Sequence, residues 1–302
     1  MREPESEALG ELLDERDHLM NLAFRMLGSR NDAEDVVQQT YVRWFQLTDA
    51  EREAIERPRA WLTTVASRIC LNILDSARVR RERYVGEWLP EPLPAMTTDV
   101  SSASAPAVDP LDRITLDDSV SMALLVVLES LTPAERVAFV LHEVFGVPFA
   151  EIADIVGRSP EATRQLASSA RRHIRDVRSR PTDASEHARL VTAFRLACEN
   201  GDFEALIGIL DPQATSVSDG GGKVRSALRP VVGADSVARF ILGVLRKAPD
   251  FTAEEQDVNG EPGLVVSRGD QVVGVVTLGI DAGRIRDIWI VMNPDKLEAW
   301  NR

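Results

Sequence analysis

The stretch FAEIADIVGRSPEATRQLASSARRHI, residues 149–174, predicts two helices joined by a tight turn. FAEIADIV has the pattern of a short helix, Gly157 supplies the turn, and Ser159 with Pro160 caps and opens a second helix. A short helix, a glycine turn and a helix with polar and basic exposed positions are typical of the helix-turn-helix, which places its second helix in the DNA major groove. The stretch therefore predicts a DNA-binding element.

The second helix of this pattern carries side chains suited to DNA. Arg164 can pair with guanine and Gln165 with adenine, and the helix N-terminus at Ser159 can bind phosphate. A surface helix in a structural bundle would explain these side chains poorly, because the charges are nearly all of one sign. The candidate DNA contacts are Ser159, Glu161, Arg164, Gln165, Ser168, Arg171, Arg172 and Arg175.

The net charge of −13 over 302 residues argues against a protein that coats nucleic acid alone, since phosphate neutralisation dominates such binding. Two segments are nonetheless basic. Residues 68–83 hold five arginines against two acids, and residues 159–180 hold six arginines against two acids. Either segment alone is best explained as a solvated helix face. Two of them on an acidic chain favour two DNA contacts made with the help of a large partner.

Residues 1–83 are predicted to form an all-helical domain, because their apolar residues recur at helical spacing. Gly28 ends the first run as a C-cap glycine. Asn31 followed by Glu34 has the form of a capping box that opens the next helix, and Pro58 opens a third helix.

Residues 84–114 contain five prolines and almost no helical pattern, which indicates a linker. Its first residues are apolar and are expected to form an anchor that docks on another surface. These residues are Tyr84, Val85, Trp88 and Leu89, beside Pro90 and Pro92.

Residues 115–180 are predicted to be helical again and to end in the helix-turn-helix. Thr132, Pro133 and Glu135 combine an N-cap, a proline in the first turn and a reciprocal glutamate. They are expected to start a helix over residues 135–145.

Residues 185–302 change character and predict an α+β domain. Two short helices come first, and a helix near residues 233–246 lies among β-prone segments. A hairpin is expected to turn at residues 268–270, and residues 283–293 form a last strand, so the strands are expected to be antiparallel. The predicted fold is multidomain, with two all-α domains and a C-terminal α+β domain.

The composition sets limits on the kind of protein. The chain has no apolar stretch long enough to span a bilayer, and its acidic N-terminus does not have the character of a signal peptide. Cys70 and Cys198 lie far apart without metal-ligand spacing, so both are expected to be reduced residues of helix cores. We expect a cytoplasmic protein with no cofactor and no metal.

Three segments in order resemble the extracytoplasmic-function (ECF) family of RNA polymerase sigma factors. They are DAEDVVQQTYVRWF (32–45), WLTTVASRICLN (61–72) and the helix-turn-helix stretch. The C-terminal domain resembles a SnoaL-like domain of the nuclear-transport-factor-two-like fold. YVGEWLPEP (84–92), DGGGK (219–223) and NPDKL (293–297) resemble marks of the ECF subgroup that carries this fused extension. The resemblance implies a sigma factor, a non-enzymatic subunit of RNA polymerase that directs initiation at promoters.

The resemblance implies that residues 32–45 bind the coiled coil of the polymerase β′ subunit and that part of the apolar face before the helix-turn-helix meets the β flap. Exposed acids and amides along one helical stripe suit an arginine-rich partner. The alternative, a solvated acidic helix start, leaves the paired glutamines and the nearby tryptophan unexplained. The expected contacts are Asp32, Asp35, Gln38, Gln39 and Trp44.

The resemblance also implies two promoter contacts, with the helix-turn-helix on the −35 element and residues 1–83 on the −10 element. Opening the −10 element requires a flipped base to enter a pocket, at a cost of roughly a few kcal/mol. The family's pocket loop corresponds to residues 48–58, which are unusually acidic for a DNA contact. Taken alone, Asn72 would be an ordinary exposed helix asparagine. The expected −10 contacts are Arg59, Trp61, Arg68 and Asn72.

The subgroup resemblance implies a C-terminal tail that modulates activity in place of a separate anti-sigma factor. DGGGK is expected to form a tight flexible loop, with Lys223 available to a carboxylate or a phosphate. The expected regulatory residues are Tyr84, Trp88, Pro90, Asp219, Gly220, Gly221, Gly222 and Lys223.

Two other classes of protein remain open from the residues. A ligand-sensing helix-turn-helix regulator would leave residues 8–83 unexplained. A cyclase or hydratase fused to a DNA-binding region needs an acid/base set, but Asp219, Asp281, Asp287 and His187 do not form an evident one. For the C-terminal domain we favour docking, then ligand sensing, then catalysis.

Overall fold

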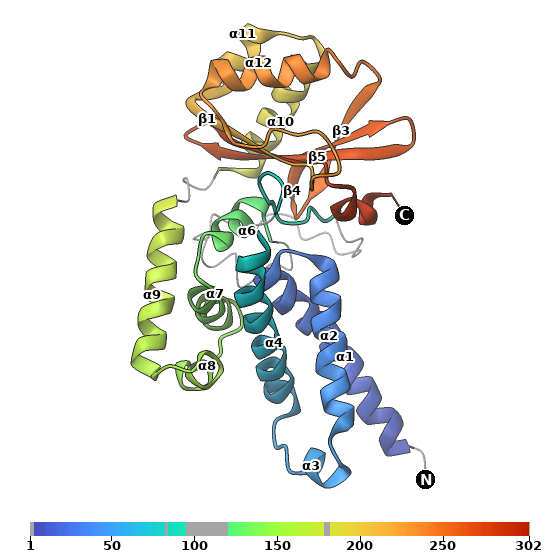
Figure 1. The fold of residues 1–302 in the computed structure, drawn as a ribbon, viewed down its shortest axis with the longest axis vertical. Coiled ribbons are helices and arrows are strands. Elements are labelled where there is room, and N and C mark those ends of the chain that lie inside the picture. The colour runs from blue at the N-terminus through green and yellow to red at the C-terminus, as the bar shows by residue number, and fades with distance from the viewer. Residues whose placement is uncertain (1–2, 82–83, 95–119, 178–181, 302) are drawn as a thin grey trace. The chain divides into compact units, whose positions relative to one another are not determined.

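The computed structural model describes residues 3–81, 84–94, 120–177 and 182–301, and the chain divides into two compact units (Figure 1). The N-terminal unit holds the described residues of 1–80 and 128–174. The C-terminal unit holds those of 81–110, 119–127 and 175–302. No described helix is both long and apolar enough to cross a membrane.

The N-terminal unit is built from helices, as predicted. Up to residue 81 these are α1 (Glu3–Leu27), α2 (Arg30–Gln46), α3 (Asp49–Glu53) and α4 (Pro58–Arg81). After α6 (Met122–Glu129) come α7 (Pro133–Phe139), the π-helix η1 (Val140–Val144), α8 (Phe149–Val156) and α9 (Pro160–Val177).

The turn between α1 and α2 confirms one cap prediction and corrects another. Gly28 has φ 66°, and its N–H donates to the carbonyl of Phe24 at 2.8 Å, so it ends α1 as expected. The N-cap of α2 is Ser29, whose hydroxyl accepts from the N–H of Asp32 at 3.3 Å. The capping box expected at Asn31 is therefore wrong, because the helix begins one residue earlier.

The segment after Thr132 begins as predicted and then changes its helical period. Thr132 and Glu135 form a reciprocal capping box, with Pro133 in the first turn of α7. The single helix expected over residues 135–145 instead continues from α7 as η1. In the helix-turn-helix, Gly157 has φ 65° and ends α8 in the left-handed conformation, which confirms the predicted turn.

A buried arginine ties α1 to α7 inside the N-terminal unit. Arg136 is 2% exposed, and its Nη1 donates to the carbonyl of Met26 at 2.9 Å and to Glu129 Oε1 at 2.6 Å. A cation suits this place because the last carbonyls of α1 lack helical partners. The largest fully buried apolar side chains of this unit include Leu19, Leu22, Met26, Leu62, Leu128, Phe139, Leu141, Ile152 and Ile174.

The C-terminal unit is an α+β domain, as predicted. Its helices are α10 (Ala184–Glu199), α11 (Phe203–Ile209) and α12 (Ala234–Leu245). Its strands are β1 (Leu210–Asp219), β2 (Val231–Val232), β3 (Phe251–Val258), β4 (Glu261–Arg268), β5 (Gln271–Asp281) and β6 (Arg284–Val291), in the sheet order β2-β1-β6-β5-β4-β3. The short 3₁₀ helices η2 (Pro294–Lys296) and η3 (Glu298–Trp300) end it.

The sheet corrects the expectation of purely antiparallel strands. The hairpin between β4 and β5 turns at Gly269, with φ 59°, as predicted. However, β1 and β6 run parallel, with Val217 opposite Trp289. The chain between them holds β2, α12 and the strands β3, β4 and β5, and β6 comes into the direction of β1 after three successive antiparallel reversals from β3.

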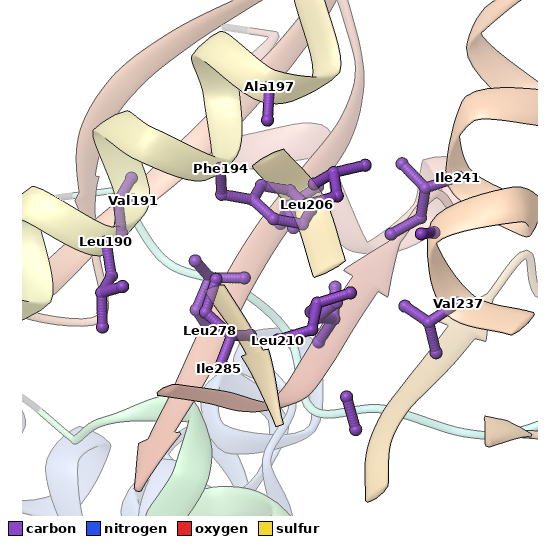
Figure 2. Close-up of a cluster of buried hydrophobic side chains, with 14 of the residues drawn as sticks. Leu190, Val191, Phe194, Ala197, Leu206, Leu210, Val237, Ile241, Leu278 and Ile285 are labelled. Carbon is purple, nitrogen blue, oxygen red and sulfur yellow. The ribbon is translucent and has the colours of Figure 1, made fainter. Parts of the chain in front are cut away.

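Each face of this sheet packs against a different set of residues. Helices α10, α11 and α12 cover one face, where Phe194, Leu206 and Ile241 meet strand residues such as Leu278 and Ile285 (Figures 1 and 2). Side chains on the opposite face belong to a second cluster that includes the linker and the start of α6. Its members are Leu89, Met122, Val258, Val275, Trp289, Val291 and Leu297.

Candidate nucleic-acid interface and a buried clasp

Helix α9 separates into a buried face and an exposed face. The buried face holds Thr163, Ala167, Ala170 and Ile174. The exposed face holds Glu161, Arg164, Gln165 and Ser168. Both sets follow the helical period, so packing of the first set presents the second to solvent. The structure thus places the four predicted base-reading side chains together.

The start of α9 is ordered by local contacts. Ser159 is exposed, and its hydroxyl accepts from the N–H of Ala162 at 3.2 Å. Hydrogen bonds at the helix N-terminus, and then the nearby Arg164, lower the pKa of Glu161. The Arg164 guanidinium lies 5.3 Å from the centroid of the Phe149 ring, which limits its range of positions.

The arginines of the last turns of α9 differ in their availability. Arg171 forms an ion pair with Glu143, whereas Arg172 and Arg175 are exposed and have no ion pair among the described residues. Arg178 and Arg180, which belong to the predicted basic segment, lie outside the residues whose side chains are described. Arg172 and Arg175 are thus the arginines here best placed to meet a phosphate backbone.

Helix α2 presents the predicted polar stripe with one correction. Asp35, Gln38 and Gln39 are exposed, and Asp32 is half-buried. Trp44 is only 7% exposed, so its ring belongs to the core and the expectation that it contacts a partner is not met.

Two apolar residues of α2 instead face solvent on the side of the helix that carries the exposed acids and amides. Val42 is 50% exposed and Phe45 is 53% exposed. Val42 is seven residues after Asp35, and Phe45 is ten residues after it. Because a helix has 3.6 residues per turn, both lie on the same side of α2 as Asp35.

Helix α4 brings only part of the predicted −10 set together. Arg68 and Asn72 are exposed and four residues apart, so they share a face. The half-buried ring of Trp61 lies 5.3 Å from that of Trp44, edge to face. Arg59 is nine residues before Arg68, which places it on the opposite side of the helix.

The arginines around α4 already have partners in the N-terminal unit. Arg59 forms an ion pair with Glu15 at 3.2 Å. Arg68 Nη2 donates to the carbonyl of Asp154 on α8 at 3.3 Å, and Arg57 forms an ion pair with Glu151 on α8 at 3.0 Å. The side chains of Arg78, Arg80, Arg81 and Arg83, in the first predicted basic segment, lie outside the described residues.

A buried carboxylate in the C-terminal unit is surrounded by four donors. Asp219, at the end of β1, is 0% exposed. Its Oδ1 accepts from the Tyr84 hydroxyl at 2.6 Å and from the Gly221 N–H at 2.9 Å. Its Oδ2 accepts from Lys296 Nζ at 2.7 Å and from the Leu89 N–H at 3.0 Å. A buried charge is tolerated when paired and hydrogen-bonded in this way.

Further contacts hold the linker residues around this carboxylate. Lys296 Nζ lies 4.0 Å from the centroid of the Trp88 ring and also donates to the carbonyl of Leu89. Asn293 Nδ2 donates to the Tyr84 hydroxyl at 3.0 Å, and Trp300 Nε1 donates to the carbonyl of Pro92 at 2.8 Å. We call the whole set the linker clasp: Tyr84, Trp88, Leu89, Pro92, Asp219, Asn293, Lys296 and Trp300.

Tyr84 and Pro90 show that the linker residues of the linker clasp are partly shielded from solvent. Burial, followed by the hydrogen bond to Asp219, raises the pKa of the Tyr84 phenol. Pro90 is buried, as an anchor requires. The predicted docking residues of the linker therefore lie against the C-terminal domain.

The DGGGK loop is packed into place. Gly221 has φ 62°, and a Cβ there would lie 2.4 Å from Asn293 Cγ. Gly222 has φ 70°, and a Cβ there would lie 3.1 Å from Val85. Lys223, expected to bind a carboxylate or a phosphate, pairs with Asp295 at 2.6 Å. DGGGK and NPDKL thus meet in the structure, although they are 70 residues apart in the chain.

Comparison with known proteins identifies the family. Sigma-70 region 2 matches residues 13–82, and Sigma-70, region 4 matches residues 121–174. The ECF RNA polymerase sigma factor SigJ of Mycobacterium tuberculosis is 39% identical over 295 residues, which cover 93% of this chain and 90% of SigJ. This chain belongs to the ECF sigma factors. Members of the family bind core RNA polymerase and promoter DNA and are not enzymes.

Two further comparisons extend the likeness over almost the whole chain. The probable ECF RNA polymerase sigma factor SigI of Mycobacterium tuberculosis is 40% identical, covering 94% of this chain and 92% of SigI. The crystal structure of SigJ superposes with a TM-score of 0.73 at 34% identity, over 96% of this chain and 98% of that chain. This coverage includes the C-terminal domain, and the predicted layout of two sigma helical domains followed by an α+β C-terminal domain is confirmed.

The carboxylates that could suggest catalysis in this ECF sigma factor have separate roles. Asp219 belongs to the linker clasp. Asp281 pairs with Arg286 at 3.3 Å, and Asp287 accepts from the Thr215 hydroxyl at 2.5 Å. Burial raises the pKa of Asp287. In the described part of the chain they share no hydrogen bond with His187, and no group of metal-ligating side chains was found there.

The sequence patterns did not predict three residues that the structure places on the exposed side of α2 or beside the linker. Phe45 and Val42 could have been recognised because they are apolar yet out of phase with the buried residues of α2. Asn259, whose Oδ1 accepts from the Leu93 N–H at 2.9 Å, carries no such signal. Its role depends on a contact between residues 166 apart in the chain.

Proposed function

We propose that this ECF sigma factor reads the −35 element through the exposed face of α9. The single observation that carries the proposal is the division of α9 into two faces in a chain of this family. Arg164 and Gln165 are exposed side by side, and each can form two hydrogen bonds to one base. Arg172 and Arg175 extend the same helix toward the DNA backbone, where they contribute affinity without sequence preference.

The −10 element is assigned to α4. Asn72 offers an amide to a flipped base and Arg68 offers a cation to the flanking phosphates, on one helix face. Arg68 has to leave the carbonyl of Asp154 before it can bind DNA. We exclude Arg59 from this face, because it lies on the opposite side of α4 and pairs with Glu15.

The polymerase contact is assigned to α2. Its exposed stripe of Asp35, Gln38, Val42 and Phe45 combines carboxylate and amide groups with apolar area. Such a stripe suits the β′ coiled coil, with arginines facing the polar part and apolar side chains facing the rest. The β flap is the proposed partner of the region 4 helices. The assembled complex acts in the cytoplasm, where transcription takes place.

The linker clasp is proposed to regulate this activity without catalysis. Residues 84–94 leave region 2 and precede region 4, so they belong to the tether that joins the two DNA-binding domains. The reach of a tether controls whether two linked domains can occupy their sites at once. The C-terminal unit packs against residues of this linker and against the start of α6, so it holds both ends of the tether, and in this way it modulates promoter binding.

Run-off transcription with purified core polymerase tests the promoter assignment. The full chain should give a promoter-specific transcript. Arg164→Ala with Gln165→Ala should relax base preference at the −35 element, each contact being worth about 1–3 kcal/mol. Arg16→Ala, which removes an exposed arginine of α1, is the matched control and should keep the preference. Unchanged preference at every −35 base in the double variant would contradict the assignment.

A further inference from the structure

A large cavity lies inside the C-terminal unit, on the helix-covered side of the sheet. Its volume is about 1220 Å³, and α10, α12 and the strands line it. Ligand sites in proteins are commonly concave, mostly apolar and provided with a few polar groups. The apolar part of this wall includes Phe194, Phe240, Ile241, Leu264, Val276 and Ile290.

A buried hydroxyl in the cavity wall has no partner. Ser218 lines the cavity, is 1% exposed, and its Oγ makes no hydrogen bond among the described residues. Buried polar groups in proteins are nearly always hydrogen-bonded, since an unpaired one costs free energy. A ligand oxygen is one way to satisfy this hydroxyl. Ser226, on the loop after β1, adds a second hydroxyl to the same wall.

The charged residues of the cavity are mostly basic, although the whole chain is acidic. Five basic and two acidic side chains line it, in a chain with a net charge of −13. Two of the basic residues are neutralised: Arg195 pairs with Glu199 and Glu255, and Arg239 pairs with Asp235.

The other three basic residues of the wall are available to a ligand. Arg225, Arg246 and Lys247 have no ion pair in the part of the chain that the structure describes. The wall also holds one acidic residue without an ion pair among the described residues, Glu254, which is exposed on β3. Arg225 is next to Ser226 in the sequence, so a free cation and a hydroxyl share the loop that closes this end of the cavity.

We propose that this cavity binds an amphipathic organic anion. Its apolar body packs against Phe194, Ile241 and Val276, and its anionic group meets Arg225 with the hydroxyls of Ser218 and Ser226. The apolar area favours the body of any such molecule, and the unpaired cation selects the anion over a neutral analogue of equal size. This binding does not depend on the proposed function, because it can be measured on the full chain without polymerase or DNA.

Two fluorescent probes with the same ring skeleton test the proposal. These are 1-anilinonaphthalene-8-sulfonate, an anion, and N-phenyl-1-naphthylamine, which lacks the sulfonate. Both are titrated into the full chain. Saturable binding of the sulfonate, tighter than binding of the neutral probe, is expected.

Two variants and one control assign the site. Arg225→Gln should weaken binding of the sulfonate about tenfold and leave the neutral probe unchanged, since one charged hydrogen bond is lost. Arg229→Gln on the same loop is the control, because Arg229 is exposed and does not line the cavity. Gly243→Phe should weaken both probes. Gly243 lines the cavity inside α12, and a Cβ there meets no heavy atom within 4 Å, so the variant can fold.

Three results would overturn the proposal. The first is the absence of saturable sulfonate binding to the wild type. The second is sulfonate binding that Gly243→Phe leaves intact in a variant that unfolds at the wild-type temperature, since the probe then binds elsewhere. The third is an equal response of the two probes to Arg225→Gln, since the cation then plays no part in selection.

Discussion

Helix α9 and the linker clasp both depend on charged side chains, but they use them in opposite ways. On α9 the predicted base-reading residues are exposed, and the helix is held by the apolar residues of its other face. In the linker clasp, Asp219 is fully buried and receives four hydrogen bonds. Exposed charges are available to a partner and add little to stability, whereas buried ones become costly when a partner is removed.

The largest effect is expected from Asp219→Ala. The change leaves Lys296, whose side chain is 10% exposed, without its carboxylate, at a cost of about 3–5 kcal/mol in the stability of the C-terminal unit. Chemical denaturation followed by tryptophan fluorescence measures it. Asp295→Ala is the control, because the Lys223–Asp295 pair is 55% and 56% exposed and should contribute about 0–1 kcal/mol. Equal losses from the two variants would contradict the account.

Two glycines with similar backbone angles compare the close packing around the linker clasp with the open surroundings of the helix-turn-helix. Gly221 in the DGGGK loop and Gly157 in the helix-turn-helix have φ 62° and 65°. An added Cβ at Gly157 meets nothing within 4 Å, so Gly157→Ala should cost only about 1 kcal/mol for the left-handed conformation. Gly221→Ala also collides with Asn293 and should cost at least about 2 kcal/mol. Thermal unfolding of both variants gives the order, and the reverse order would contradict the packing described.

Arg172→Ala should change DNA binding with little effect on folding. Its exposed guanidinium is proposed to neutralise one phosphate, so the variant should weaken binding to all −35 sequences alike. The slope of log K against log salt should fall by about 1. Fluorescence anisotropy at several salt concentrations measures this slope. Arg171→Ala serves for comparison, because Arg171 is paired with Glu143 and should change the slope less.

The smallest effect is expected in the pH dependence of stability, through a histidine of the N-terminal unit. Burial, and then the charge of Arg59, lower the pKa of His18 from 6.5 to about 4. Between these values the unfolded chain takes up a proton that the folded chain does not, so this contribution to stability is complete above pH 6.5 and is lost as the pH falls toward 4. Unfolding measured across this range should show a shallower decline for His18→Gln than for the wild type. The exposed His173→Gln is the control, and a decline identical to the wild type in His18→Gln would refute the assignment.

Local patterns in the sequence predicted the elements whose signals are local. The helix-turn-helix, the cap at Thr132 and the turn at Gly269 are confirmed, because each depends on residues close together in the chain. The anchor character of residues 84–92 is also confirmed; their apolar composition indicated it, although the carboxylate that they contact is distant in the chain. The thiol of Cys70 is buried, and burial raises its pKa. Burial also raises the pKa of the Cys198 thiol to about 12, so both thiols lie in low-polarity surroundings, as expected for residues of helix cores.

Features set by distant contacts could not be predicted in the same way. Trp44 was expected to face a partner, but Trp61 on another helix packs against it. The parallel pairing of β1 with β6 joins residues about 70 apart, so no alternation within one strand reveals it. Asp219 was noted as a loop residue, and its central place in the linker clasp depends on Tyr84 and Lys296, on either side of it in the chain. The contacts of the −10 and −35 surfaces with DNA stay predictions.

The most direct test of the account measures run-off transcription when two hydrogen bonds of the linker clasp are removed. Tyr84→Phe combined with Trp300→Phe removes the hydrogen bonds to Asp219 and to the carbonyl of Pro92, while the packed ring of Tyr84 is kept. With core polymerase, this variant should change promoter output at least about threefold. A threefold change corresponds to about 0.7 kcal/mol, since every 1.4 kcal/mol corresponds to a factor of ten. Its −35 base preference should be that of the wild type. Output equal to that of the wild type and of Asp295→Ala would contradict control by the linker clasp.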